Sequence, residues 1–421
     1  MSSGPSIIFD KSALESLNPD EAVWLDQFFT SNITPVFFLE VLGDLQKAGK
    51  RGRTPDQIVG NLAYKTPDMN AGPNVHHLDL LAAELSGSDK VDMHRYNPVL
   101  GHWIPVALGD QAGIMFKQTP EEEAFIRWQD HRFREFERAA AKSWRARVRE
   151  LNHQAIYDMF QSVAAVGGRP KSLAEVKTKA DSVIDNMPSD RLLKFGLRLM
   201  GYPPRVYTAV LERWRTSGEP LIREFLPYFC YVLSVNLFFY IGMAADLISR
   251  DRPSHTIDMS YLYYLPFCMV FTSNDRLHAT TAPLFMTLEQ SFVPGGELKA
   301  DLARLDAHYS ALPEEEKSKG VYHMASEPPD DSSFLVTRLW DKYDPDWRQV
   351  KESRKKPEDL RMTDAMKSLM AQLKKAKAVQ GSSVSPEAAA YVTMERRVRI
   401  RQGKWRRFPP EVKPDTGEDD K

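Results

Sequence analysis

Two short apolar runs lie far apart in the chain, and each leads to a carboxylate. Residues 6–9 are followed directly by Asp10, and residues 267–271 lead through a short polar turn to Asp275. Apolar runs of this length are typical of strands that are buried on both faces of a parallel sheet. The pattern therefore predicts two buried strands, each of which delivers an aspartate to the edge of a sheet.

Helical patterns follow the first predicted strand. Asn18, Pro19 and Asp20 have the character of a helix start, and a second, very apolar helix is expected over residues 35–45. Residues 51–113 contain scattered Pro, Gly and Asn without a clear period. Loops and short helices are expected there, and no site is predicted.

The middle of the chain has helical periodicity throughout. Residues 120–159 combine many charges with spaced aromatic side chains, the pattern of long amphipathic helices. Further helices are predicted as far as Ile248, with breaks at residues 167–170 and 202–204. Together these segments predict an all-helical insertion.

The pattern changes again after Arg250. Residues 256–265 predict a helix ahead of the second strand, and residues 298–309 predict another helix after it. Linkers rich in Pro and charge follow, and the tail from Pro410 has the composition of a disordered segment.

One stretch, residues 226–248, is apolar enough and long enough to be scored as a membrane span. Pro227, Asn236 and Asp246 lie inside it, and polar groups are unfavourable in a lipid-facing segment. We therefore interpret the stretch as a buried central helix, with a membrane anchor as the alternative.

Composition limits the class of protein. Of the 421 residues, 42% are hydrophobic and 27% are charged, which predicts a globular chain with room for two or three compact units. A net charge of −1 excludes a uniformly basic nucleic-acid binder.

The two cysteines, Cys230 and Cys268, have neither CxxC spacing nor adjacent histidines, so neither a disulfide framework nor a zinc site is indicated. The first residues do not have the pattern of a signal peptide, and a cytoplasmic setting is expected.

A set of four acidic positions carries the chemistry that the sequence suggests. Two follow the predicted strands, one lies inside an apolar helix and one opens the helix before the second strand. The order Ile7-Ile8-Phe9-Asp10, Phe38-Leu39-Glu40, Thr256-Ile257-Asp258 and Val270-Phe271-Thr272-Ser273-Asn274-Asp275 resembles the PIN-domain superfamily of nucleases. The resemblance covers residues 6–48 and 254–290 and leaves most of the chain unexplained. It implies an acidic pocket at the carboxyl end of a parallel sheet, formed by Asp10, Glu40, Asp258 and Asp275.

The same resemblance implies the organisation of the chain. An α/β fold is expected, in which a PIN-like parallel sheet flanked by helices is split by a mostly α-helical insertion. The long separation of Glu40 from Asp258 departs from the compact family pattern and leaves the substrate open. The expected parts are the N-terminal part of the core in residues 1–115, the insertion in 116–250, the C-terminal part of the core in 251–295, and a helical, basic and partly disordered extension in 296–421.

Clustered carboxylates suit a hard divalent cation. Mg²⁺ and Mn²⁺ prefer oxygen ligands, and phosphodiester hydrolysis needs positive charge near the attacking and leaving oxygens. The resemblance therefore implies a nuclease that depends on Mg²⁺ or Mn²⁺ and acts on RNA more often than on DNA, with the four acidic residues as metal ligands and catalytic groups. The rival hypothesis is a catalytically silent PIN-like scaffold that binds a protein or nucleic-acid partner, with the protein partner on the insertion. No GxxxxGK[ST] loop, GxSxG elbow or HExxH helix points to another chemistry.

The three aspartates also have a structural interpretation. Asp10 and Asp275 could cap the helices that follow them, and Asp258 could interact favourably with the dipole of its helix from the first turn. Glu40 is harder to explain in this way. Its apolar neighbours place it close to the buried side of its helix, where an unpaired carboxylate is costly.

Four further residues lie beside this set. Asp44 follows the glutamate by one helical turn, Ser273 and Asn274 precede the last aspartate, and His278 follows it by one turn. Asp44 could be a further ligand or an outer-shell group, and Ser273 and Asn274 could orient a metal-bound water or a carboxylate. His278 could contact a phosphate. The simpler interpretation is a solvated position for Asp44, a turn at Ser273 and Asn274, and a surface histidine at 278.

A basic run near the C-terminus is a candidate nucleic-acid surface. Arginines that can pair with phosphates alternate there with aromatic side chains that can stack on bases. A solvated segment is the alternative interpretation. The predicted contact residues are Arg396, Arg397, Arg399, Arg401 and Trp405.

Overall fold

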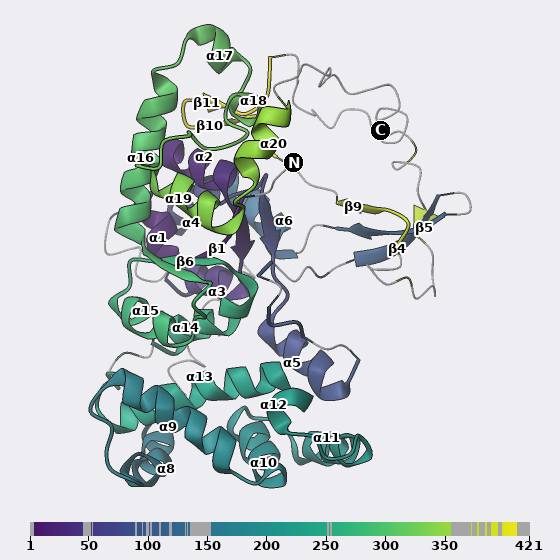
Figure 1. Ribbon diagram of the computed structural model, residues 1–421, viewed down its shortest axis with the longest axis vertical. Helices are drawn as coiled ribbons and strands as arrows, with labels where there is room; N and C mark the ends of the chain where they lie inside the picture. The colour runs from purple at the N-terminus through teal and green to yellow at the C-terminus, as the bar shows by residue number, and fades with distance from the viewer. Residues whose placement is uncertain are drawn as a thin grey trace.

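A computed structural model of the protein shows a parallel sheet surrounded by helices and a separate helical bundle beneath it in the view of Figure 1. The structure describes residues 4–44, 52, 54–88, 91–94, 96–97, 101, 103–108, 111–117, 120–130, 132, 134, 153–250, 252, 255–354, 372, 377–378, 384, 389–394 and 398–410.

Five short strands form the central sheet, and each neighbouring pair is parallel. The order is β3-β2-β1-β6-β7, so the two strands predicted from the sequence, β1 and β6, are adjacent in the centre. Ile7 lies opposite Val270, and Phe9 lies opposite Thr272. The carboxyl ends of β1 and β6 therefore meet at one edge. The strands are β1 (Ser6–Phe9), β2 (Thr30–Ile33), β3 (Ala71–Pro73), β6 (Val270–Ser273) and β7 (Ser291–Pro294).

Helices flank this sheet, which confirms the α/β fold class. The first predicted helix start is correct, since Asn18 and Glu21 form a reciprocal capping box at the start of α2. The helix predicted before the second strand is shorter than expected and continues as a 3₁₀ helix that contains Pro266. The flanking helices are α1 (Lys11–Ser16), α2 (Pro19–Phe28), α3 (Pro35–Asp44), α4 (Pro55–Lys65), α14 (His255–Ser260), η2 (Tyr261–Phe267), α15 (Arg276–Thr281), η3 (Ala282–Leu284) and α16 (Gly295–Ser310). Helix α5 (His77–Ser86) lies beside the helical bundle instead.

Residues 153–244, within the segment predicted to be helical, form a bundle of α-helices. Gly167 and Gly168, both with positive φ, separate its first two helices, and Pro203 and Pro204 lie at the second predicted break. The helices are α8 (His153–Ala165), α9 (Leu173–Asn186), α10 (Ser189–Leu199), α11 (Pro204–Thr216), α12 (Ile222–Phe225) and α13 (Pro227–Ala244).

Helix α13 is the apolar stretch that has the composition of a membrane span. It is the one described helix that is long and apolar enough to cross a bilayer, and 78% of it is buried inside the protein. Helices α8, α9 and α5 pack against it, and Phe229, Leu233 and Leu237 have no exposed surface. A helix that is apolar on all sides is expected at the centre of a core, so the buried central helix is the interpretation that fits.

Residues 51–113 contain more regular structure than the sequence indicated. Besides α4, β3 and α5, they contribute β4 (Trp103–Leu108) and the start of β5 (Gln111–Phe116), which form an antiparallel hairpin. This hairpin belongs to a second, four-stranded sheet with β8 (Lys377–Ala378) and β9 (Val392–Met394). Helix α6 (Pro120–Gln129) follows and packs on α4.

The C-terminal extension returns to the core. Helix α16 matches the helix predicted over residues 298–309, and short helices follow it. A small hairpin of β10 (Arg401–Gln402) and β11 (Trp405–Arg406) then lies next to α2 and α16, at the opposite end of the molecule from α13 (Figure 1). The tail after Pro410 lies outside the described residues. The remaining helices are α17 (Glu314–Ser318), α18 (Val321–Met324), α19 (Leu335–Tyr343) and α20 (Trp347–Arg354).

Candidate functional site

Asp10 lies at the carboxyl end of β1 and is 3% exposed. Its Oδ1 accepts a hydrogen bond from the backbone N of Ala13 at 2.8 Å, so it caps α1 as one sequence interpretation expected. The hydroxyl of Ser12 lies 2.7 Å from its Oδ2. Capping fixes the carboxylate in place and does not prevent its oxygens from facing other groups.

A chain of hydrogen bonds connects Asp10 to β6 and α15. Ser273 Oγ donates to Asp10 Oδ2 at 2.7 Å and lies 2.8 Å from Nδ1 of His278, while Nε2 of His278 lies 2.8 Å from the carbonyl oxygen of Asp258. A carbonyl oxygen only accepts, so Nε2 carries a proton. The single proton of Ser273 is given to Asp10, so Nδ1 must donate to Ser273. The contacts of both ring nitrogens therefore describe a positively charged imidazolium.

The charges of Asp10 and His278 stabilise each other. Burial alone would lower the pKa of His278, but the hydrogen bond and negative charge of Asp10, together with Asp258, raise it to about 9. Burial likewise opposes ionisation of Asp10, but His278, Ser273 and Ala13 outweigh it and leave the pKa of Asp10 below its usual value. The interpretation of His278 as a surface residue is wrong, because its side chain is 1% exposed.

Glu40 reaches the same edge from α3. Its Oε2 accepts from the hydroxyl of Tyr261 at 2.7 Å and from the backbone N of Lys11 at 3.4 Å. Glu40 is partly buried, as its apolar neighbours in the sequence predicted. Tyr261 has no exposed surface, and burial together with the charges of Glu40 and Asp10 raises the pKa of its phenol well above the usual value. The phenol is therefore a fixed hydrogen-bond donor to the glutamate.

Asp258 lies in the first turn of α14, and the other acidic groups affect its pKa. Burial is the largest cause that raises its pKa, and the charges of Glu40, Asp275 and Asp10 add to it. His278 partly offsets them, and the resulting pKa is about 7. A carboxyl group that the other three carboxylates all perturb lies within electrostatic reach of each of them.

Asp275 is the N-cap of α15, and its Oδ1 accepts from the backbone N of Leu277 at 2.6 Å. Its own backbone N donates to Ser273 Oγ at 2.9 Å. The capping interpretation is therefore confirmed, and Ser273 and Asn274 form the turn that was expected. Asn274 also ties this turn to α1, because its backbone N donates to Ser12 Oγ at 3.1 Å.

The structure thus brings together all four acidic residues that the sequence singled out. They come from four separate segments, and the carboxyl edge of the parallel sheet is where those segments meet. Within the described ranges, no three His, Cys, Asp or Glu side chains lie in a ready-made arrangement for a metal ion. The donors are all carboxylate oxygens with hydroxyls beside them, which is the ligand chemistry that Mg²⁺ and Mn²⁺ prefer.

Sequence reasoning missed part of this site. Ser12 and Tyr261 contact the acidic residues directly, and neither was singled out. His255, at the start of α14, has its pKa lowered by burial and also lies within electrostatic reach of Asp275 and His278. The spacing of Ser12 two residues after Asp10 was an available signal. The side chain of Asp44 lies outside the described residues.

The predicted nucleic-acid contacts divide into three groups. Arg396 and Arg397 lie outside the described residues. Arg399 is held inside the protein by Asp68, to which its Nε donates at 2.6 Å, and Trp405 is 5% exposed and donates to Asp306 at 2.7 Å. Arg401 is exposed. Of the described three, only Arg401 presents its charge to solvent.

The comparisons with known proteins add no relative: no protein-family model, no curated protein and no solved structure matches the chain. The proposal for a function therefore rests on the geometry of the acidic edge, by which we mean Asp10, Glu40, Asp258 and Asp275 at the carboxyl end of the parallel sheet.

Proposed function

We propose that the protein is a PIN-like nuclease that hydrolyses phosphodiester bonds of nucleic acid, RNA in preference to DNA, with a bound Mg²⁺ or Mn²⁺. The observation that carries the proposal is the meeting of four carboxylates at one edge of the sheet, where burial first, and then the charges of Glu40, Asp275 and Asp10, raise the pKa of Asp258 to about 7 although His278 lowers it. Repulsion of this kind costs stability, and clusters of strongly perturbed groups are characteristic of functional sites. The parallel sheet flanked by helices is compatible with a PIN-like core.

The residues of the proposed site have two kinds of role: some would bind the metal, and others orient those ligands. Asp10, Glu40, Asp258 and Asp275 would hold the metal, which supplies positive charge to the phosphate and to the attacking water. Ser12 and Ser273 hold the Asp10 carboxylate in one orientation, and Tyr261 does the same for Glu40. In the hydrolysis, water would add to phosphorus and lose a proton, while the bond from phosphorus to the leaving oxygen breaks and that oxygen takes up a proton. The rigid carboxylates would limit the reorganisation that this requires.

Cleavage of labelled single-stranded RNA and DNA in Mn²⁺ tests the proposal. Asp10→Asn and Asp275→Asn are compared with the wild type and with an EDTA control. Each variant keeps the side-chain oxygen that caps its helix. Asp10→Asn also removes the charge that pairs with buried His278, so circular dichroism and the melting temperature of each variant are measured before cleavage is compared. Glu212→Gln, an exposed position on α11, is the matched control for loss of one negative charge.

The expected result is cleavage by the wild type and by Glu212→Gln, and a loss of at least a hundredfold in both aspartate variants and in EDTA. Cleavage that persists in both aspartate variants would place the activity elsewhere or in a contaminant. A comparison of the RNA and DNA rates identifies the preferred polymer.

One observation favours a second candidate, a catalytically silent scaffold. His278 already supplies a positive charge 3.4 Å from Asp10, so the core of the acidic cluster is partly neutralised by the protein itself. A scaffold predicts no cleavage on any substrate and no change in melting temperature on addition of Mn²⁺. A metal-dependent nuclease predicts a rise in melting temperature with Mn²⁺, since a ligand that binds the folded state stabilises it.

A further inference from the structure

A basic pocket of about 430 Å³ lies between the β10–β11 hairpin and the junction of α16 with α17. Arg401, Lys404 and Arg406 line it from the hairpin, and Lys317 lines it from α17. Among the described residues that line it, Glu314 is the one carboxylate. This pocket contains none of the four acidic residues of the candidate site.

The hairpin presents its charges outward because its side chains alternate. Gln402 pairs with Trp405 on the inner side, and both are buried, whereas Arg401 pairs with Arg406 on the outer side. Successive residues of a strand point to opposite faces, so burial of the first pair directs the second pair outward. Gly403 makes the tight turn between the strands, with a φ of +58°.

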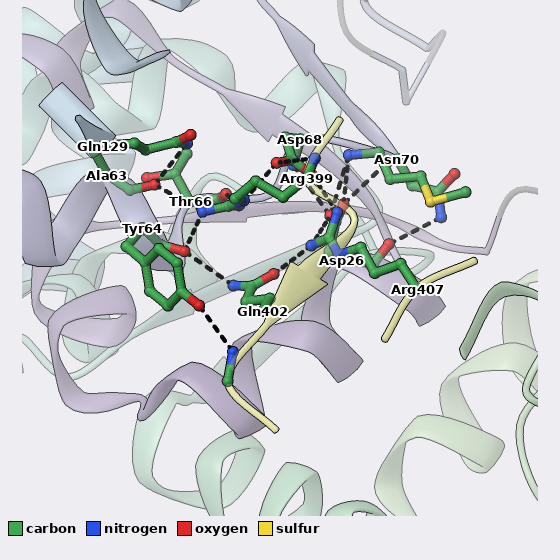
Figure 2. A network of polar contacts seen from close by, with 12 residues as sticks. Asp26, Ala63, Tyr64, Thr66, Asp68, Asn70, Gln129, Arg399, Gln402 and Arg407 are labelled. Carbon is green, nitrogen blue, oxygen red and sulfur yellow. Dashed lines mark hydrogen bonds and ion pairs between the residues drawn. The ribbon is translucent and has the colours of Figure 1, made fainter. Parts of the chain in front are cut away.

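A buried ionic network fixes the hairpin on the core, as Figure 2 shows. Arg407 lies 2.8 Å from Asp26 of α2 and also pairs with Asp68, while Arg399 donates to Asp68 at 2.6 Å. Asp26 in turn accepts from the backbone N of Asn70 at 2.9 Å. Arg399 and Arg407 flank the hairpin on both sides in the sequence, so the two ends of the segment are clamped. The backbone of the hairpin that carries Arg401, Lys404 and Arg406 is therefore fixed on the core.

The pocket has an excess of positive charge. Lys317 pairs with Glu314 at 2.6 Å, Lys404 pairs with Asp306 at 2.6 Å, and Arg406 donates to the carbonyl oxygen of Phe408 at 2.9 Å. Glu314 is 90% exposed, so its ion pair with Lys317 is weak and easily exchanged for a stronger anion. For Arg401, no side-chain hydrogen bond or ion pair to another described residue is found. Among the described residues, four cations lie at the pocket against the two carboxylates of Glu314 and Asp306, a balance that favours an anion.

We propose that this pocket holds a backbone phosphate of a nucleic-acid strand and acts as a second contact for the substrate of the acidic site, an inference that rests on the proposed function. The planar guanidinium of Arg401 matches the two oxygens of a phosphate, and Lys404 and Lys317 add charge around it.

Helix α16 connects the carboxyl end of the outer strand β7 to the pocket. Helix α16 starts at Gly295, directly after the carboxyl end of β7, and its last residue, Ser310, lines the pocket. A helix of 16 residues spans about 24 Å. That distance corresponds to roughly seven stacked nucleotides at about 3.4 Å each.

Fluorescence anisotropy with a labelled single-stranded RNA of 16 nucleotides tests the proposal in EDTA, so that binding is measured without cleavage. The double variant Arg401→Gln/Lys317→Gln is expected to bind about tenfold more weakly and to show a shallower dependence of affinity on salt. Arg401→Gln alone is the milder variant, and its exposed position leaves folding intact. The control is Arg205→Gln on α11, an exposed position in the helical insertion, which should bind as the wild type does.

Equal affinity of the wild type and the double variant would overturn the proposal. A double variant that loses binding of inorganic phosphate but keeps full affinity for RNA would also overturn it, and would assign the pocket to a free phosphate compound. The outcome is distinguishable from that of the cleavage experiment. RNA that binds through the pocket without being cut would support the phosphate contact, but it would remove the nuclease function and with it the role of the pocket as a second contact for a nuclease substrate.

Discussion

Nδ1 of His278 lies 3.4 Å from Oδ2 of Asp10, and both side chains are almost completely buried. The pair connects α15 to the end of β1, with Ser273 between them. In a buried ion pair, the attraction between the two charges offsets the cost of removing each from water. Removal of one partner therefore leaves the other charged and unsolvated. The acidic edge therefore depends on a histidine for its stability as well as on its hydrogen bonds.

This pair predicts that the protein loses stability at alkaline pH. The pKa of His278 is about 9 in the folded protein against 6.5 as its ordinary value. A raised pKa stabilises the fold fully below pH 6.5, and the contribution is lost as pH rises through 9. The free energy of unfolding is expected to fall by at most roughly 3 kcal/mol over this interval. Urea denaturation at pH 6 and at pH 9.5 measures the change.

His278→Gln is the control, because glutamine can keep a neutral hydrogen bond without titrating. The variant should be less stable at pH 6 and should show a much smaller difference between the two pH values. A wild type with equal stability at pH 6 and 9.5 would contradict the assignment of a charged imidazolium.

Asp258 predicts how metal affinity depends on pH. Its pKa of about 7 means that a proton competes with Mn²⁺ for this carboxylate below neutrality. Affinity for Mn²⁺ is expected to rise by up to about tenfold between pH 6 and pH 7 and to level off above pH 8. Isothermal titration calorimetry in two buffers of different ionisation enthalpy also measures the proton released. In Asp258→Asn the slope below pH 7 should disappear, and a slope that remains would assign the proton to another group.

The sequence predicted the centre of the fold and missed its edges. The strands β1 and β6 lie in the middle of the sheet and are buried on both sides, so their residues are apolar and easy to recognise. The outer strand β3, with the sequence Ala-Gly-Pro, has almost no strand propensity and is held by pairing with β2. Strand β2, Thr-Ser-Asn-Ile, is mostly polar and also lacks the pattern of a buried strand. Such strands exist because a neighbour supplies the hydrogen bonds, which no local pattern reveals.

The same limit applies to the acidic edge. The four carboxylates could be picked out because each follows or interrupts an apolar segment. Tyr261 was not singled out, and His278 was noted beside them without its burial, because their contacts with Glu40 and Asp10 connect segments that are distant in the chain. Burial of a polar side chain depends on what packs against it. An isolated histidine one turn into a helix gives no sign of this, and the simpler interpretation of a surface residue was wrong.

Tyr261 offers a test of the glutamate's position. Tyr261→Phe removes the hydroxyl that donates to Glu40 at 2.7 Å and leaves the ring packed against Phe271. A hydrogen bond to a charged group contributes about 1.5–3 kcal/mol, and partial exposure of Glu40 places the expected loss of stability near the lower end. Thermal unfolding measures it. If the proposed nuclease function is correct, Mn²⁺ affinity should also fall several-fold, whereas an unchanged affinity would show that the phenol does not orient Glu40.

The last prediction concerns the network that clamps the C-terminal hairpin. Burial opposes ionisation of Asp26, but the charge of Arg407 and the backbone N–H groups of residues 68–70 outweigh it, and the pKa of Asp26 is lowered. A lowered carboxyl pKa stabilises the fold above the ordinary value of 3.8, and the contribution is lost as pH falls below it.

Arg407→Met leaves Asp26 and Asp68 buried with one cation fewer, and the free energy of unfolding at pH 7 is expected to fall by about 3–5 kcal/mol. Arg407→Lys should recover only part of the loss, since an ammonium cannot bridge two carboxylates as a planar guanidinium does. Arg401→Gln, on the outward face of the same hairpin, should change stability by no more than about 0.5 kcal/mol. Urea denaturation ranks the three variants. If Arg407→Met and Arg401→Gln were equally stable, the network would contribute nothing to the fold, and the hairpin that carries cations of the basic pocket would need another explanation for its fixed position.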